Sequence, residues 1–299
     1  MKLGKFDIYP VLDGFFRLDG GAMFGVIPKV LWQKTNQPDT NNRILLALRT
    51  CLIDTHKDLL LIDTGIGDKY EDKFEDIYQV KKEINLKNSF KQVNKKFEDV
   101  TIVINTHLHF DHCGGNTKID TNGNIVPTFP NAKYYIQKSE WEAANNPDSR
   151  SRASYLKENF QILEHAKVLH LVDGDQKITD DIEVIKTSAH TYGHQVVLIT
   201  SNDSHRDSET TEKNPVNPVE RKSETLIYWG DLIPTVSHLN LPYIMSYDLF
   251  PLQTMEQKEK LLNKALKEDW VSFFEHDPKI AIATLIQEEK RIRIKSVIE

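Results

Sequence analysis

The feature that most constrains this chain is a group of metal-competent side chains that follows a short β-branched run. Residues 101–105 predict a strand, because β-branched side chains favour an extended backbone. Four such side chains follow it within six residues: His107, His109, Asp111 and His112. The pleat of an extended chain has a period of two, so it points His107 and His109 in one direction, where one metal ion can bind both imidazoles. Asp111 and His112 then turn toward a second position, at the end of the strand.

A solvated polar loop with a few hydrogen-bonded histidines is the alternative interpretation of this segment. The chain has 11 histidines, and three of them fall within residues 107–112. Because imidazole is the commonest metal ligand among side chains, this concentration favours a metal site.

Apolar patterns elsewhere alternate between strand and helix periodicity. Strands are predicted at residues 6–11, 44–53, 59–62, 133–136, 168–171, 182–186, 196–200, 226–229, 271–274 and 280–285. Helices are predicted twice within 68–97, at 139–145 with Ser139 as N-cap, at 155–165 and at 256–268. We therefore expect one domain over residues 1–299, with mixed sheets covered by helices. The polar residues 201–223 are expected to form a mobile surface excursion.

Composition and charge exclude several classes of function. The 38 lysines and arginines against 44 aspartates and glutamates give a net charge of −6, so nucleic acid is not an expected partner. No apolar run approaches the roughly 20 residues of a membrane span, and residues 1–7 lack the apolar segment of a secretory signal. Cys51 and Cys113 are too few for a disulfide framework. We expect a cytoplasmic protein with reduced thiols and no membrane contact.

The segment at 107–112 resembles the His-X-His-X-Asp-His motif of the metallo-β-lactamase-fold hydrolases. Further pieces along the chain extend the resemblance: Leu61-Ile62-Asp63-Thr64-Gly65 resembles the first motif of that family, Ser188-Ala189-His190-Thr191-Tyr192-Gly193-His194 the third, Gly230-Asp231 the fourth and Glu275-His276-Asp277 the fifth. The resemblance implies an α/β, four-layer αββα sandwich with a mononuclear or dinuclear metal site at the sheet edge.

The residues themselves support this placement, because each candidate follows a short apolar run. Asp63 follows residues 59–62 and His190 comes after 182–186; Asp231 and His276 follow predicted strands in the same way. Side chains at the ends of strands converge on one rim of a sheet.

The resemblance also implies a ligand assignment. One ion would be bound by His107, His109 and His190, the other by Asp111, His112 and His276, with Asp231 bridging them. Zinc suits this His-rich set, and manganese, cobalt and iron accept it as well.

Two of the motif residues carry alternative interpretations. His190 and His194 compete for one ligand position; the resemblance favours His190, which leaves His194 as a supporting or structural residue. For Asp63, support of the metal site is weighed against formation of a turn, since aspartate before Thr-Gly is a common turn former.

Two divalent ions about 3.5–4 Å apart can hold a hydroxide between them and polarise an electrophilic oxygen. Hydrolysis of an ester-type bond is the expected reaction, with Asp231 between the ions and Asp111 passing a proton to the leaving group.

Residues 20–28 resemble the N-terminal loop of the branch that contains the quorum-quenching N-acyl-homoserine lactonases and methyl parathion hydrolase, where the loop gives the site an apolar wall. We expect the apolar wall to be formed by Met23, Phe24, Ile27 and Phe110. His238 is either a polar group near the leaving oxygen or a surface histidine. These features favour a small substrate with an apolar portion: a lactone first, then a phosphotriester or aryl ester.

Other functions remain open. A glyoxalase II-like thioesterase or a β-lactamase would use the same fold, and a non-catalytic metal-binding sensor could retain it. A homodimer is one alternative for the oligomeric state.

Overall fold

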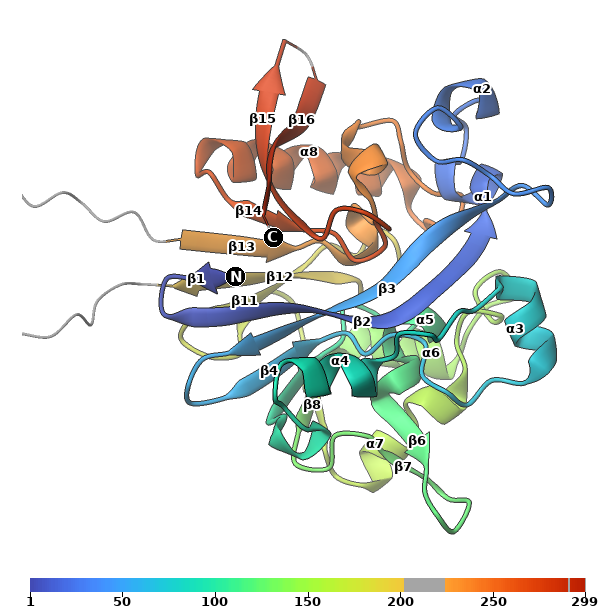
Figure 1. The fold of residues 1–299 in the computed structure, drawn as a ribbon, viewed down its shortest axis with the longest axis vertical. Helices are drawn as coiled ribbons and strands as arrows, with labels where there is room; N and C mark the ends of the chain where they lie inside the picture. The colour runs from blue at the N-terminus through green and yellow to red at the C-terminus, as the bar shows by residue number, and fades with distance from the viewer. Residues whose placement is uncertain (202–223, 290, 299) are drawn as a thin grey trace, which may run out of the picture.

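A computed structural model describes residues 1–201, 224–289 and 291–298 of the chain. Two seven-stranded sheets face each other in these residues (Figure 1). The first contains, in spatial order, β1 (Lys2–Leu3), β2 (Phe6–Asp19), β3 (Arg43–Asp54), β4 (Leu59–Ile62), β5 (Ile102–Ile104), β8 (Lys133–Gln137) and β9 (Leu169–Val172). The second contains β10 (Gln176–Lys177), β11 (Ile182–Lys186), β12 (Gln195–Ser201), β13 (Glu224–Tyr228), β14 (Val271–Phe273), β15 (Ile282–Glu288) and β16 (Arg291–Ile298).

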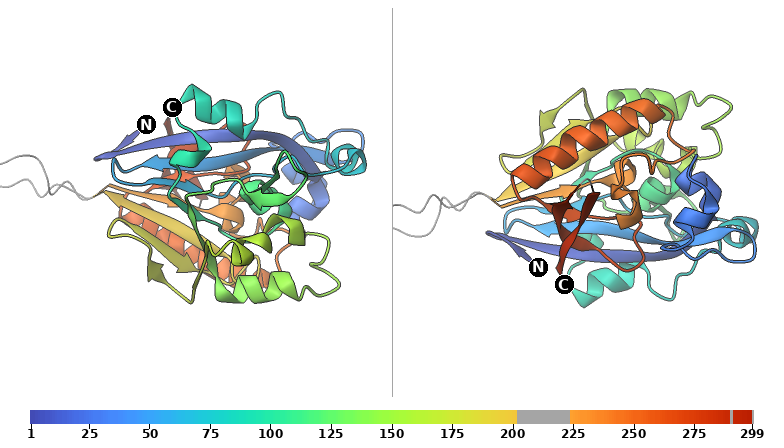
Figure 2. Two further views of the ribbon diagram at one scale, coloured as in Figure 1. Left: turned by 90° about the horizontal axis from the view of Figure 1, so that it is seen from below. Right: turned by 90° about the horizontal axis from the view of Figure 1, so that it is seen from above.

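α4 (Leu86–Gln92) and α8 (Pro251–Lys267) cover the outer faces of the two sheets, so the layers follow the predicted αββα order (Figure 2). The other helices are α1 (Gly20–Phe24), α2 (Lys29–Trp32), α3 (Asp72–Tyr78), α5 (Phe110–Cys113), α6 (Lys138–Asn145) and α7 (Ile162–His165). A small hairpin, β6 (Thr117–Ile119) with β7 (Ile125–Pro127), extends from the first half. Within the described ranges, no helix combines the length and the apolar character that crossing a bilayer requires.

The central core lies between the sheets. Ile53 and Ile104 of the first sheet are completely buried in one cluster with Val197 and Phe273 of the second. Each outer face has a separate cluster, one under α4 and α6 and the other under α8, whose Leu261 and Leu262 face its sheet. Apolar strands buried on both faces explain the continuous hydrophobic runs in the sequence.

Parallel pairs bring the motif residues together. β4, β5, β8 and β9 pair in parallel in the first sheet, and β13 pairs in parallel with β14 in the second. The carboxyl ends of parallel neighbours lie at the same edge, so the segments after β4 and β5 meet there. The segments after β13 and β14 meet in the same way.

Several predicted boundaries need correction. The predicted helix at 155–165 is wrong: a 3-10 turn at Lys157–Asn159 and the short α7 replace it, because Phe160 leaves helical geometry at φ −141° and is fully buried. Ser139 lies inside α6, and the N-cap is Gln137. β2 extends well past residue 11, to Asp19, through a bulge between Leu12 and Phe15. Of the predicted excursion at 201–223, Ser201 ends β12 and residues 202–223 lie outside the described residues.

Candidate metal centre

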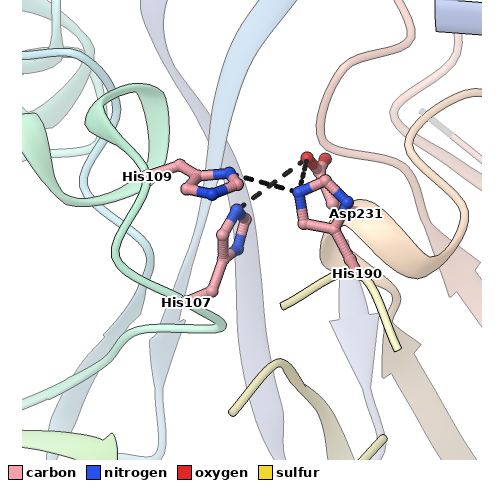
Figure 3. A group of neighbouring side chains, drawn as sticks. All are labelled: His107, His109, His190 and Asp231. Atoms are coloured by element: carbon pink, nitrogen blue, oxygen red, sulfur yellow. Dashed lines mark hydrogen bonds and ion pairs between the residues drawn. The ribbon is translucent and has the colours of Figure 1, made fainter. Parts of the chain in front are cut away.

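The first group of candidate ligands contains His107, His109, His190 and Asp231 (Figure 3). His107 and His109 do not continue a strand, as the pleat argument assumed, because β5 ends at Ile104. The alternation persists in the loop: Leu108, between them, is buried in the core under α4 and α6. The two imidazoles therefore face the opposite side, toward His190 and Asp231.

The distances in this group fit a shared cation. Nε2 of His190 lies 3.2 Å from Nδ1 of His109, and Asp231 Oδ2 lies 3.2 Å from Nε2 of His190 and 3.9 Å from Nε2 of His107. Nε2 of His107 is buried with no hydrogen-bond partner among the described residues. A buried polar atom is expected to be paired, so a nitrogen left in this position is suited to a divalent metal ion.

The second group contains Asp111, His112 and His276. Asp111 and His112 lie on the short helix α5, and His276 follows β14. Nε2 of His276 is 3.1 Å from Nε2 of His112 and 3.6 Å from Asp111 Oδ2. The structure thus assembles the same two sets of side chains that the resemblance implies, from segments up to 165 residues apart.

Asp231 lies between the two groups and faces both. Its Oδ2 is directed at His107 and His190, whereas Oδ1 lies 3.5 Å from Nε2 of His112 and 3.3 Å from that of His276. The backbone at Gly230 has φ +51°, and a Cβ there would come within 3.0 Å of His194 Nε2. Glycine is therefore required for the turn that presents Asp231.

His194 supports Asp231 and belongs to neither group. Its Nε2 accepts the backbone N–H of Asp231 at 3.1 Å, and its Nδ1 lies 2.8 Å from the hydroxyl of Thr187. Both ring nitrogens are therefore engaged, which agrees with a supporting residue.

Hydrogen-bond partners outside the two groups fix the orientation of three ligand rings, and Asp63 fixes that of a fourth, His112. Nδ1 of His190 contacts Asp248 Oδ1 at 2.7 Å, and Nδ1 of His276 contacts the carbonyl of Ala47 at 2.7 Å. Nδ1 of His107 lies 3.0 Å from the hydroxyl of Thr106. Each ring is thereby left with Nε2 directed into the cluster, as in metal sites whose outer hydrogen bonds fix the tautomer.

Asp63 combines the two roles weighed for it. It has a left-handed φ of +55°, as a turn residue does, and its carboxylate accepts the backbone N–H and the hydroxyl of Thr106, both at 2.7 Å. The same carboxylate contacts Nδ1 of His112 at 3.2 Å, the fourth ligand ring, and Glu275 Oε2 lies 3.1 Å from that nitrogen. Asp63 thus links the segments after β4 and β5.

The candidate ligand histidines differ in the direction in which their surroundings shift the pKa. Burial and neighbouring imidazoles hold the pKa values of His107 and His109 well below the usual range, so both rings are neutral, the form that binds metal. For His276, burial lowers the pKa, but Asp231 and Glu275 outweigh it and raise the value to about 9. In the same way His112 and His190 outweigh burial and keep the pKa of Asp231 well below normal. A carboxylate held ionised at this depth attracts cations.

A cavity of about 60 Å³ opens beside the two groups. Besides ligand residues, its wall consists of Leu18, Met23, Tyr78, Phe110, Ser154, Met245 and Tyr247. Met23 and Phe110 were expected there. The other wall residues were missed, because they come from separate segments with no common pattern: Leu18 lies in β2, Tyr78 in α3, and the rest in loops.

Phe24, Ile27 and His238 do not reach this cavity. Phe24 is completely buried, stacked between Trp32 and His238 at ring distances of 5.3 and 4.8 Å. His238 is buried as well, and its Nε2 donates to the carbonyl of Met23 at 2.8 Å while Nδ1 contacts the Thr235 hydroxyl at 2.8 Å. It is neither a surface residue nor a cavity group; it anchors the segment that carries Met23. Ile27 packs into the same cluster from outside.

Acidification is expected to destabilise the protein through His238. Burial lowers its pKa to about 3, against about 6.5 in an unfolded chain. The unfolded state binds the extra proton between these values, so this contribution is complete above pH ~6.5 and is lost as the pH falls toward 3, up to roughly 5 kcal/mol. Unfolding in denaturant at several pH values measures it. His238→Gln should reduce the proton uptake on unfolding, which the pH dependence of the unfolding free energy reports, by about one proton. Substitution of an exposed histidine, His165→Gln, should not change it.

Asp248 received no separate role from the sequence, yet its carboxylate orients His190. Asp248→Ala should therefore weaken metal binding by about 10- to 100-fold, the range seen when such outer partners are removed. Competition with a chromogenic chelator measures this affinity. Unchanged affinity would show that the contact has no part in metal binding.

Fold and side chains together define a metal-binding αββα protein. Comparison with known proteins identifies the family within this class. The profile of the metallo-beta-lactamase superfamily matches residues 50–203. An N-acyl homoserine lactonase of Bacillus cereus is 30% identical over 179 residues, which cover 54% of this chain and 62% of the relative. The chain thus spans less than two thirds of that relative's length.

Two solved structures share the fold. A probable metal-dependent hydrolase from Staphylococcus aureus has a TM-score of 0.86 at 27% identity and covers 100% of this chain and 98% of its own. AidC, described as a dizinc quorum-quenching lactonase, has a TM-score of 0.73 at 19% identity, with 100% and 97% covered. The chain belongs to the metallo-beta-lactamase superfamily.

Proposed function

We propose that this protein is a dinuclear metal-dependent hydrolase that opens the ester bond of lactones, with N-acyl homoserine lactones as its main substrates. The observation that carries the proposal is the shared carboxylate of Asp231, which presents one oxygen to each ligand group at the cavity floor. Ions bound on either side of one carboxylate can act on the same bond. The relative named N-acyl homoserine lactonase supports the choice of substrate.

Two divalent ions would supply an activated water and polarise the substrate carbonyl. Zinc is the proposed metal, because five of the seven candidate ligands are histidines and the neighbour AidC is described as dizinc. Asp111 lines the cavity as well as the second group, so its carboxylate is placed to hold the proton that the leaving oxygen takes up.

The cavity binds the reacting end of the substrate. Its small volume accommodates a ring or ester group, so an acyl chain must leave through the mouth past the apolar walls. Burial raises the pKa values of Tyr78 and Tyr247, and both phenols therefore stay protonated at neutral pH. Either can donate a hydrogen bond to a polar group of the substrate.

The test is a substrate panel on protein of measured metal content. It contains acyl homoserine lactones of several chain lengths, a phosphotriester, an aryl ester, a thioester and a chromogenic cephalosporin. We expect kcat/KM for a lactone to exceed the others at least tenfold, with weaker phosphotriesterase or arylesterase activity. Preference for the thioester or cephalosporin would contradict the lactonase proposal. Less than one metal per chain and no turnover would favour a non-catalytic sensor.

We further propose that the enzyme acts in the cytoplasm as a single domain. Cys51 and Cys113 are both free and buried, which suits a reducing compartment.

A further inference from the structure

A second cavity lies apart from the candidate metal centre, between α4, the turn after β4 and the β6–β7 hairpin. These elements occupy the lower part of Figure 1. Its volume is about 490 Å³, within the range of about 300–1,000 Å³ typical of small-molecule sites. We call it the lysine groove; its charged and apolar lining is formed by Asp13, Asp68, Lys69, Leu86, Lys87, Phe90, Lys91, Lys95, Lys96, Phe97, Glu98, Lys118 and Ile119.

The lining of the groove carries more positive than negative side chains, whereas the chain as a whole has a net negative charge. Lys95 is paired with Asp54, and the acidic Asp13 and Asp68 both contact Lys82. No ion pair among the described residues engages the other lysines of the lining, which are Lys69, Lys87, Lys91, Lys96 and Lys118. In a protein of net charge −6, five lysines without carboxylate partners around one cavity favour an anionic ligand.

Two polar groups in the lining retain hydrogen-bonding capacity. The hydroxyl of Thr128 is buried and has no hydrogen-bond partner in the described part of the chain. The ammonium of Lys69 donates to the carbonyls of Gly114 and Thr117, which leaves one of its three N–H groups for a ligand. Both residues bond to one segment: the backbone N–H of Thr128 donates to the carbonyl of Asn116, and Lys69 donates to that of the next residue, Thr117. A buried donor without a partner is unusual in a native structure.

The remaining surface of the groove is apolar. Leu86 and Phe90 form a buried floor, and the ring of Phe97 packs edge-on against Phe90 at 5.0 Å. Ile119 is 57% exposed at the edge. A simple inorganic anion would leave the accessible part of this surface, at Phe97 and Ile119, in contact with water.

We propose that the lysine groove binds a small anion that carries an apolar group, such as a carboxylate on a medium-length acyl chain. The head group contacts the lysines and the hydroxyl of Thr128, and the chain covers Phe97 and Ile119. This site is separate from the candidate metal centre, although Thr64 and Gly115 in its wall adjoin the segments that carry Asp63 and His112.

Calorimetric titration of decanoate into the metal-loaded protein tests the proposal, with acetate and inorganic phosphate as probes of the anion alone. We expect saturable binding of decanoate and at least tenfold weaker binding of the other two. The double variant Lys91→Glu/Lys96→Glu should weaken decanoate binding at least tenfold. The matched control, Lys260→Glu/Lys267→Glu on the exposed face of α8, should change it less than twofold.

A variant of the metal centre separates the two sites, because a carboxylate can also bind a metal ion. Decanoate binding should be unchanged in His109→Ala. Loss of binding in that variant, equal affinity in the two lysine variants, equal affinity for phosphate, or no saturable binding would each overturn the proposal. Both double variants substitute exposed lysines only, so circular dichroism should confirm an unchanged fold.

Discussion

Asp231→Ala is expected to abolish hydrolysis and metal retention together. The substitution removes the oxygen that faces His107 and His190 as well as the one that faces His112 and His276. Both groups then lose their shared negative charge, and five histidines remain with Asp111 as the one carboxylate among the candidate ligands. Because metal ions contribute several kcal/mol to such reactions, we expect kcat/KM to fall at least about a thousandfold. Elemental analysis and lactone turnover on one preparation measure both effects.

The matched control is Asp173→Ala, which removes a carboxylate that is 75% exposed and, among the described residues, forms an ion pair with Lys186 alone, at 3.9 Å. It should leave metal content and turnover unchanged. Full activity of a chelated, metal-free sample would contradict the metal-dependent mechanism. Full metal content in Asp231→Ala would contradict only the proposal that both groups share this carboxylate.

The segments that carry the ligands could be predicted because each follows an apolar run. Parallel pairing of β4 with β5 and of β13 with β14 brings those run ends to one edge, so a pattern of single strands was enough to place Asp63, His107, Asp231 and His276 together. The alternation predicted mixed sheets covered by helices, and the resemblance implied the αββα layer order. Spacing separated His107 and His109 from Asp111 and His112, and the resemblance added His190, His276 and the shared Asp231.

Asp63 was expected from the resemblance to support the site, and it contacts His112. The other outer partners could not be predicted, because no sequence periodicity marks them. His276 is oriented by the carbonyl of Ala47, a backbone atom 229 residues away in sequence. His238 was misplaced for a similar reason: nothing near it in sequence reveals that Phe24 stacks on its ring. The predicted helix at 155–165 failed because Tyr155, Phe160 and Leu163 are buried at spacings of five and three residues, not on one helical face.

Glu140 is the most consequential of these unpredicted residues. It lies on α6, is completely buried and accepts four hydrogen bonds. Oε1 accepts the backbone N–H of Leu108 and the hydroxyl of Tyr155, both at 3.0 Å. Oε2 accepts the hydroxyl of Thr191 at 2.6 Å and the backbone N–H of Gly193 at 3.0 Å. One carboxylate therefore joins the loop of His107 and His109 to the loop of His190.

Glu140→Ala should consequently impair stability and metal binding together. Four buried donors lose their acceptor, and each unpaired group costs about 1–3 kcal/mol unless water replaces it. We expect a loss of about 3–5 kcal/mol, which lowers the melting temperature of a chain this long by about 5–10 °C. The affinity for metal should fall as well, since His190 is no longer held in register with His109. Thermal unfolding with and without chelator measures the two effects.

Glu142→Ala on the exposed side of the same helix is the matched control, and it should leave both quantities unchanged. Glu140→Gln separates charge from shape, because its amide keeps the size but offers an N–H group to two of the four donors. It should be destabilised less than the alanine variant and still bind metal more weakly than the native chain. If Glu140→Ala melted within 2 °C of native and retained its metal, the two loops would be held by other contacts, and the convergence of His109 and His190 would not depend on this carboxylate.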